Sequence, residues 1–106
     1  MIITTTNFVE DRKVADYLGV VSGEAIMGAN IFRDFFAGIR DIVGGRAASW
    51  ETVMQRAREE ALAELRHHAA LLGADAVIGV QLSFNALGAR DSMLMVAASG
   101  TAVKLG

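Results

Sequence analysis

Two histidines and a nearby glutamate are the residues of this chain best suited to bind a metal ion. His67 and His68 are its only histidines, and a neutral imidazole is a common metal ligand. Successive helical positions diverge by about 100°, so the two rings cannot easily bind one ion. Glu64 and His68, spaced i and i+4, form a better pair, although a zinc site normally takes three or four protein ligands. The sequence leaves two interpretations: a solvated helix face, or a repeated site to which each subunit of an assembly contributes one or two ligands.

A glycine pair followed by a cation suggests a second kind of site, for a small anion. Gly44 and Gly45 allow backbone N–H groups to converge, and Arg46 adds a full positive charge. Ser49 can cap the helix that follows, whose N-terminus favours negative charge. The spacing and the lysine of a phosphate-binding loop are missing, so the pattern does not indicate a nucleotide. The alternative is a tight turn between two helices, in which Arg46 pairs with an acidic side chain or with a neighbouring subunit.

A methionine pair and an aspartate pair could bind a metal or transfer protons, but packing and ion pairing are simpler roles for them. Met93 and Met95 share one face of a predicted strand; thioethers suit Cu(I), but methionine also fills irregular cores and interfaces. Asp34 and Asp41 lie about two helical turns apart and could do acid–base chemistry only with perturbed pKa values; an ion-pair network is the alternative. No Ser-His-Asp or lysine-centred arrangement stands out and cysteine is absent. We therefore expect neither an enzyme nor a thiolate metal site.

Hydrophobic periodicity predicts four strands and two helices that would position these residues. The strands are expected at residues 2–6, 17–27, 76–84 and 93–105, and the helices at residues 31–43 and 50–72, the longer one capped by Ser49 and ended by Gly73. The last two strands should form an antiparallel hairpin. The order of these elements predicts a two-layer α+β domain with two helices on one face of a mostly antiparallel sheet.

Simple alternation predicts which strand residues share a face. In residues 17–27 one face should hold Val21, Ala25 and Met27, and the other Leu18, Val20 and Ile26. In residues 76–84 one face should hold Ile78, Val80, Leu82 and Phe84, and the other Val77, Gly79, Gln81 and Ser83. Both faces of the first of these strands are largely apolar, so one of them needs a partner surface.

The composition points to an assembly. The 106 residues make one domain, residues 1–106, and 53% of them are hydrophobic, which is more apolar side chain than a small monomer can easily cover. The longest uncharged run, residues 76–89, is shorter than the about 20 residues of a membrane-spanning helix, and the first residues lack the pattern of a signal peptide. A net charge of −2 gives no general attraction to nucleic acid. We expect a homo-oligomer of closed symmetry, in a reducing cytoplasm that the lack of cysteine fits.

Three long segments of the chain resemble a known family. They read VVSGEAIMGANIFRDFFAGIRDIVGGRAASWE, AREEALAELRHHAALLGADAVIGVQLSF and MLMVAASGTAVKL. The blocks Gly-Gly-Arg at 44–46, Leu-Gly-Ala-Asp-Ala-Val at 72–77 and Gly-Thr-Ala-Val at 100–103 are specific in combination. Over residues 4–105 the chain resembles the uncharacterised YbjQ-like family, whose label is heavy-metal-binding domain. The resemblance implies a dodecin-like α/β subunit and a ring-shaped pentamer, and it implies no catalytic residues.

Together these observations predict a non-enzymatic, homo-oligomeric binding protein. Its ligand would sit at subunit junctions near the Gly-Gly-Arg turn; a metal ion is what the family label implies, and a small anion or an apolar metabolite is equally compatible with the residues. The alternative is a structural or interaction module, in which the ring itself is the product and no small ligand binds.

Overall fold

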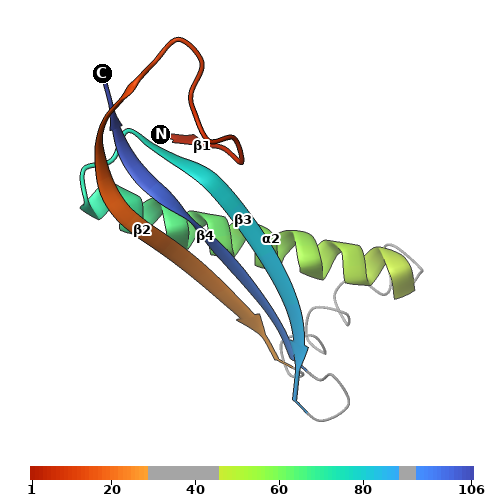
Figure 1. The fold of residues 1–106 in the computed structure, drawn as a ribbon. Helices are drawn as coiled ribbons and strands as arrows, with labels where there is room; N and C mark the ends of the chain where they lie inside the picture. Colours follow the sequence, from red (N-terminus) through yellow and green to blue (C-terminus); the bar gives the residue numbers. More distant parts are fainter. Residues whose placement is uncertain (29–45, 89–92) are drawn as a thin grey trace.

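The chain folds into a curved sheet with a long helix across one face. The computed structural model describes residues 1–28, 46–88 and 93–106, and the side chains of all of these except residues 46–50. Its elements are β1 (Ile2–Ile3), β2 (Val14–Met27), α2 (Arg46–Leu71), β3 (Ala76–Leu87) and β4 (Met93–Leu105). Figure 1 shows the three long strands lying side by side, with α2 crossing them diagonally.

The sheet is mixed, and its strand order is β1-β3-β4-β2. β4 lies at its centre and pairs antiparallel with both β2 and β3, while β1 pairs parallel with β3. The predicted α+β class and the β3–β4 hairpin are therefore confirmed. One predicted helix, at residues 31–43, lies outside the described residues, so the described part of the chain holds one helix where we expected two.

The strand boundaries differ from the predicted ones because pairing, rather than composition, sets them. β2 starts at Val14 instead of residue 17, opposite Leu105 at the end of β4. β3 continues beyond residue 84 to Leu87, opposite Met93. β1 is shorter than predicted. Residues 4–6 stay hydrogen-bonded to β3: the N–H of Thr4 donates to the Val77 carbonyl, and the N–H groups of Val80 and Gly79 donate to the carbonyls of Thr4 and Thr6. These bonds surround the bulge at Gly79, so they do not continue the regular ladder of β1.

The start of α2 corrects a prediction. We expected Ser49 to cap the helix, but α2 starts at Arg46 and places Ser49 inside its first turn. Ala47 and Ala48 explain the extension, because alanine has the highest helix propensity. The predicted stop is confirmed: Gly73 has a φ of 77°, and the N–H groups of Gly73 and Ala74 bond to the carbonyls of Ala70 and Ala69, which is the Schellman arrangement.

The main core lies between α2 and the sheet. The inward face of α2 consists of completely or almost completely buried side chains, most of them small: Val53, Ala57, Ala61, Leu65 and Ala69. Opposite them, β2 contributes Val21, Ala25 and Met27, and the central strand β4 contributes Leu94, Val96, Ala98 and Ala102. The closest approach is at Gly23 of β2, where a Cβ atom would overlap the backbone of Ala61 and Leu65. Small side chains on both elements thus allow the helix to lie directly on the strand.

Two bulges overturn the simple alternation predicted for β2 and β3. The pairing register shifts between Tyr17 and Gly19, and between Ile78 and Gln81; Gly19 and Gly79 have φ values of 126° and 62°, which glycine adopts without strain. As a result Leu18 packs against the main core instead of sharing a face with Val20 and Ile26.

The register shift in β3 places Ile78 and Val80, which we expected on one face, in different clusters. Val77 and Val80 both belong to the main core, whereas Ile78 belongs to a second, smaller cluster with Ala76, Val103 and Leu105. Val9 and Val14 pack against this second cluster. The segment that precedes β2 therefore covers one end of the sheet on the face opposite α2.

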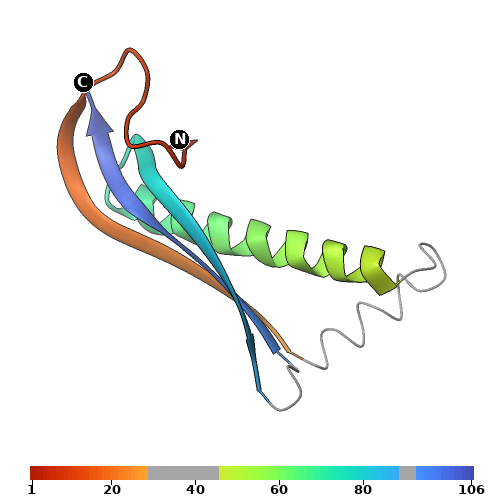
Figure 2. The ribbon, with the colours of Figure 1, turned by 45° about the vertical axis from the view of Figure 1, so that its right-hand side comes forward.

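On the β2 side, that opposite face is exposed. On β2, Val20 and Ile26 alternate with the core residues and are 81% and 54% exposed. Figure 2 shows α2 on one side of the curved sheet, with no other described helix on the opposite side. The Cα radius of gyration is 16.5 Å, larger than the about 13 Å of a compact domain of this length. In the described part of the chain, α2 is not apolar enough to be a membrane-spanning helix.

Candidate functional site

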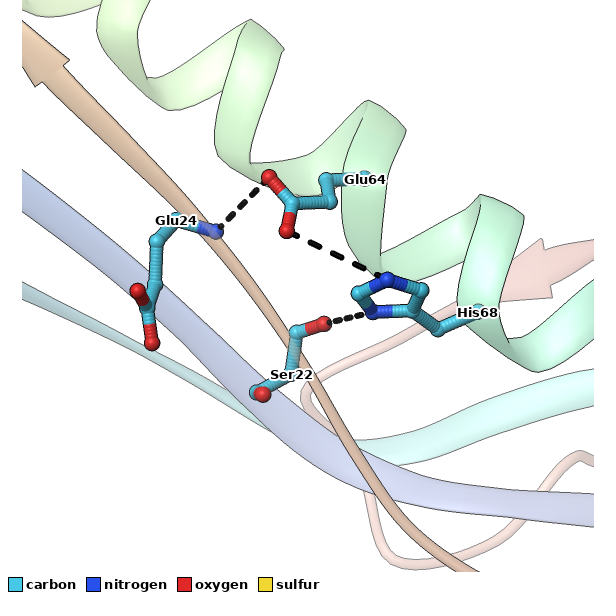
Figure 3. Close-up of polar contacts among 4 residues, drawn as sticks. All are labelled: Ser22, Glu24, Glu64 and His68. Atoms are coloured by element: carbon cyan, nitrogen blue, oxygen red, sulfur yellow. Dashed lines mark hydrogen bonds and ion pairs between the residues drawn. The ribbon is translucent and has the colours of Figure 1, made fainter.

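The candidate site forms where α2 meets the outer edge of β2. β2 is an edge strand, paired on one side with β4, so some of its backbone groups point outward and need other partners. Two of them find partners on α2: the N–H of Glu24 donates to Glu64 Oε2 at 3.4 Å, and the carbonyl of Ser22 lies 2.7 Å from His68 Nδ1. Figure 3 shows both side chains reaching from the helix to the strand.

The contact between Gly23 and α2 explains why these two side chains reach the strand. Gly23 lies between Ser22 and Glu24, and it touches the helix backbone at Ala61 and Leu65. Glu64 and His68 are one turn apart on the same side of the helix. Because Gly23 has no Cβ, α2 lies close enough to β2 for Glu64 and His68 to reach its backbone.

The contact with Ser22 fixes the tautomer of His68. A carbonyl oxygen only accepts hydrogen bonds, so Nδ1 must be the donor, and in the neutral ring the lone pair is then on Nε2. Nε2 lies 4.0 Å from Glu64 Oε1. One carboxylate oxygen and one ring nitrogen are thus held by β2, while the other oxygen and the other nitrogen face each other (Figure 3).

This arrangement matches how proteins prepare metal ligands. A histidine that binds a metal through one nitrogen usually donates the other N–H to a carbonyl or carboxylate, and ligating carboxylates are hydrogen-bonded in turn. Glu64 and His68 satisfy both conditions, and their side chains are 46% and 44% exposed, so an ion can reach them. Among the described residues, those around this pair included, no group of three or more His, Cys, Asp or Glu could hold a metal ion. The pair fits two positions of an open coordination sphere and does not fit a closed four-ligand structural site.

His67 is adjacent in sequence but is placed differently. Its ring centroid lies 6.0 Å from that of His68, and the two rings are tilted by 48°. The contacts with Ser22 and with Glu64 belong to His68. His67 therefore provides an internal comparison for any effect assigned to His68.

The predicted anion site lies mostly beyond the described residues. Gly44 and Gly45 are outside them, Arg46 is the first residue of α2, and Ser49 lies within the helix. Asp34 and Asp41 are also outside the described part. An anion at this turn remains a prediction, now without a cap from Ser49.

The methionine pair is placed within the sheet. Met95 is paired with Ile26 of β2 and with Asn85 of β3, and Met93 with Leu87. Met93 and Met95 are half-buried. Their neighbours are apolar or amide side chains, which favours packing over Cu(I) binding.

A shallow hollow of about 630 Å³ lies along the segment that precedes β2, lined by residues 7–14 and Tyr17. Phe8 and Tyr17 are largely exposed there. Two acidic and two basic side chains, at residues 10–13, line the same hollow. Because the charges of both signs are mixed, the hollow indicates no particular class of ligand.

Sequence patterns alone missed the contribution of β2 to the site. Ser22 and Glu24 act through their backbone atoms, which leave no mark on residue type. One signal was present: a glycine inside a strand often marks the close approach of another backbone, and Gly23 occupies such a position.

Comparison with known proteins agrees with the fold and with the family that the sequence resembles. The model of a family described as "Putative heavy-metal-binding" matches residues 1–106. Among solved structures, the chain is similar to a DUF74 family protein of unknown function from Pediococcus pentosaceus. The TM-score is 0.62 at 17% sequence identity, and the match covers 100% of this chain and 98% of the other. At that identity the likeness concerns the fold alone.

Proposed function

This chain belongs to the YbjQ-like family, and from that premise we propose that it is a non-enzymatic, homo-oligomeric binding protein whose ligand sits at a junction between subunits. The observation that carries the proposal is the apolar surface that the single chain leaves exposed. We place the protein in the cytoplasm, where its lack of cysteine fits a reducing environment.

The exposed apolar residues support assembly because of where they lie. Val20 and Ile26 stand on the sheet face opposite α2, and Ile26 is paired with the half-buried Met95. Fully burying one such side chain is worth about 1.5–3 kcal/mol. A Cα radius of gyration of 16.5 Å, above the about 13 Å of a compact domain of this length, agrees with the apolar sheet surface that the described residues leave exposed. A second subunit would cover that surface.

A closed ring is the form of assembly that we propose. Most homo-oligomers have closed point-group symmetry, and the family resemblance implies a pentamer. In a ring each junction repeats the same residues, so a site with one or two ligands from each subunit occurs at every junction. A metal ion is the ligand that the family description suggests. A small anion near Gly44, Gly45 and Arg46 is the alternative ligand.

The second candidate function is a scaffold that binds no small ligand. The same exposed apolar face favours it, because assembly alone would account for Val20 and Ile26. The two candidates differ only in whether the purified assembly binds a metal or an anion.

Two measurements test the proposal. Size-exclusion chromatography with light scattering at micromolar concentration should give the mass of a closed oligomer; a monomer would overturn the proposal. Elemental analysis and thermal shift with metal chlorides and with phosphate should identify a ligand. An oligomer that responds to none of them would favour the scaffold.

A further inference from the structure

We propose that Glu64 and His68 are the metal ligands of this chain, and that the edge of β2 holds them ready for a borderline divalent cation such as Zn²⁺. This inference rests on the proposed binding function and gives it a site. Neither the family description nor the structural neighbour assigns any residue to such a site.

The two nitrogens of His68 and the two carboxylate oxygens of Glu64 divide between β2 and the space beside it. His68 Nδ1 and Glu64 Oε2 are both engaged by β2, through the Ser22 carbonyl and the Glu24 N–H. The remaining pair, Nε2 and Oε1, therefore face the same space between the two side chains (Figure 3). Anchoring one end of each ligand selects the atom that is left for a metal.

The distance between the two remaining atoms is close to that between two ligands of one metal ion. Nε2 and Oε1 are 4.0 Å apart. Two ligands that each lie 2.0–2.1 Å from a tetrahedral zinc are about 3.3 Å apart. Closing the difference of about 0.7 Å requires small rotations of these two half-exposed side chains.

The part of α2 that carries the two ligands is rigidly packed. Glu64 and His68 flank Leu65, which is completely buried, and follow Ala61, which is also completely buried. Gly23 holds this part of the helix directly against β2. Ligands on a rigid element lose little conformational freedom when they bind, which favours affinity even with few of them.

The donor types select the class of metal. An imidazole nitrogen with a carboxylate oxygen suits Zn²⁺, Ni²⁺, Co²⁺ or Cu²⁺, whereas Cu(I) prefers sulfur ligands, and Mg²⁺ and Ca²⁺ prefer oxygen alone. The chain has no cysteine. The heavy-metal label of the family should therefore mean a borderline metal in this member. The exposed side of the pair leaves the other coordination positions to water or to a second subunit.

The test is calorimetric titration of the assembled protein with ZnCl₂. His68→Ala and Glu64→Gln should each weaken binding by at least about tenfold, because losing even an outer-shell partner of a metal ligand costs about that much. The control variant His67→Ala, which removes the neighbouring imidazole, should bind zinc within about twofold of the unchanged protein.

A spectroscopic readout separates ligation from a structural role. In ¹⁵N spectra of the histidine rings, Zn²⁺ should shift the Nε2 resonance of His68 and leave its Nδ1 protonated, without a comparable change at His67. Because the variants could alter folding, each is accepted only if its circular dichroism spectrum and oligomer mass match those of the unchanged protein.

Three outcomes would overturn this inference: no zinc binding at all, equal losses in His67→Ala and His68→Ala, or an Nε2 resonance that zinc does not shift. The proposed function fails differently, by a monomeric mass. An intact oligomer without zinc binding at this pair removes the metal site and leaves the scaffold.

Discussion

Replacing Gly23 with alanine should separate α2 from the sheet. An added Cβ would overlap the carbonyl oxygen of Ala61 and the backbone nitrogen of Leu65, and would crowd the backbone of Glu64. These are main-chain atoms of a helix of 26 residues, so no side-chain rotation can relieve the overlap. The helix or the strand must move, and the buried alanines on the inward face of α2 would lose contacts with the sheet.

The size of the effect follows from the kind of clash. Overpacking a core usually costs 1–3 kcal/mol, and a clash with backbone belongs at the upper end, about 3 kcal/mol. Alanine has less conformational freedom than glycine in the unfolded chain, which offsets only about 0.4–1 kcal/mol of this loss in stability. A net loss of about 2–3 kcal/mol in a domain of this size lowers Tm by roughly 8–20 °C.

The assay is thermal unfolding followed by circular dichroism at fixed protein concentration, with Gly28→Ala as the matched control. No heavy atom lies within 4 Å of a Cβ built at Gly28, so that variant should change the free energy of unfolding by less than about 1 kcal/mol. In Gly23→Ala the amide of Glu24 should also exchange faster, because Glu64 moves away from it. A Tm of Gly23→Ala within 3 °C of the unchanged protein would refute the close contact between α2 and β2.

Two other substitutions probe different parts of the fold. Asp75→Ala removes the carboxylate that accepts a hydrogen bond from the N–H of Leu105 at 2.9 Å, and it should lower the free energy of unfolding, measured by chemical denaturation, by about 1–3 kcal/mol. Asp75→Asn keeps an acceptor oxygen and should lower it less. Equal losses in the two variants would contradict the role of this bond. Ile26→Glu places a charge on the exposed face of β2 and should lower the oligomer mass measured by light scattering. Arg58→Glu, on the exposed side of α2, should leave that mass unchanged. An unchanged mass in both variants would show that this face of β2 is not part of the subunit interface.

The sequence predicted the features that depend on periodicity and on local capping. The apolar stripe from Val53 to Ala69 identified the inward face of α2, and Gly73 identified its end. The β3–β4 hairpin followed from two apolar segments joined by a short polar loop. These features are local, so their residues carry the information needed to predict them.

The features that sequence patterns missed depend on contacts between distant segments. In the sequence, Gly19 and Gly79 look like ordinary strand residues. Their positive φ values belong to bulges, and these bulges place Leu18, and both Val77 and Val80, on the side of the main core. The backbone partners of Glu64 and His68 lie 40 and 46 residues earlier in the chain. Which helical residues meet the edge of β2 depends on how closely the helix packs, and Gly23 decides that.

The central claim is that this chain works as an assembly of identical subunits. Native mass spectrometry of the purified protein at micromolar subunit concentration tests it most directly. The account predicts a single closed oligomer, a pentamer as the family resemblance implies, with no substantial monomer. A spectrum in which the monomer of 11.3 kDa is the main species would contradict it.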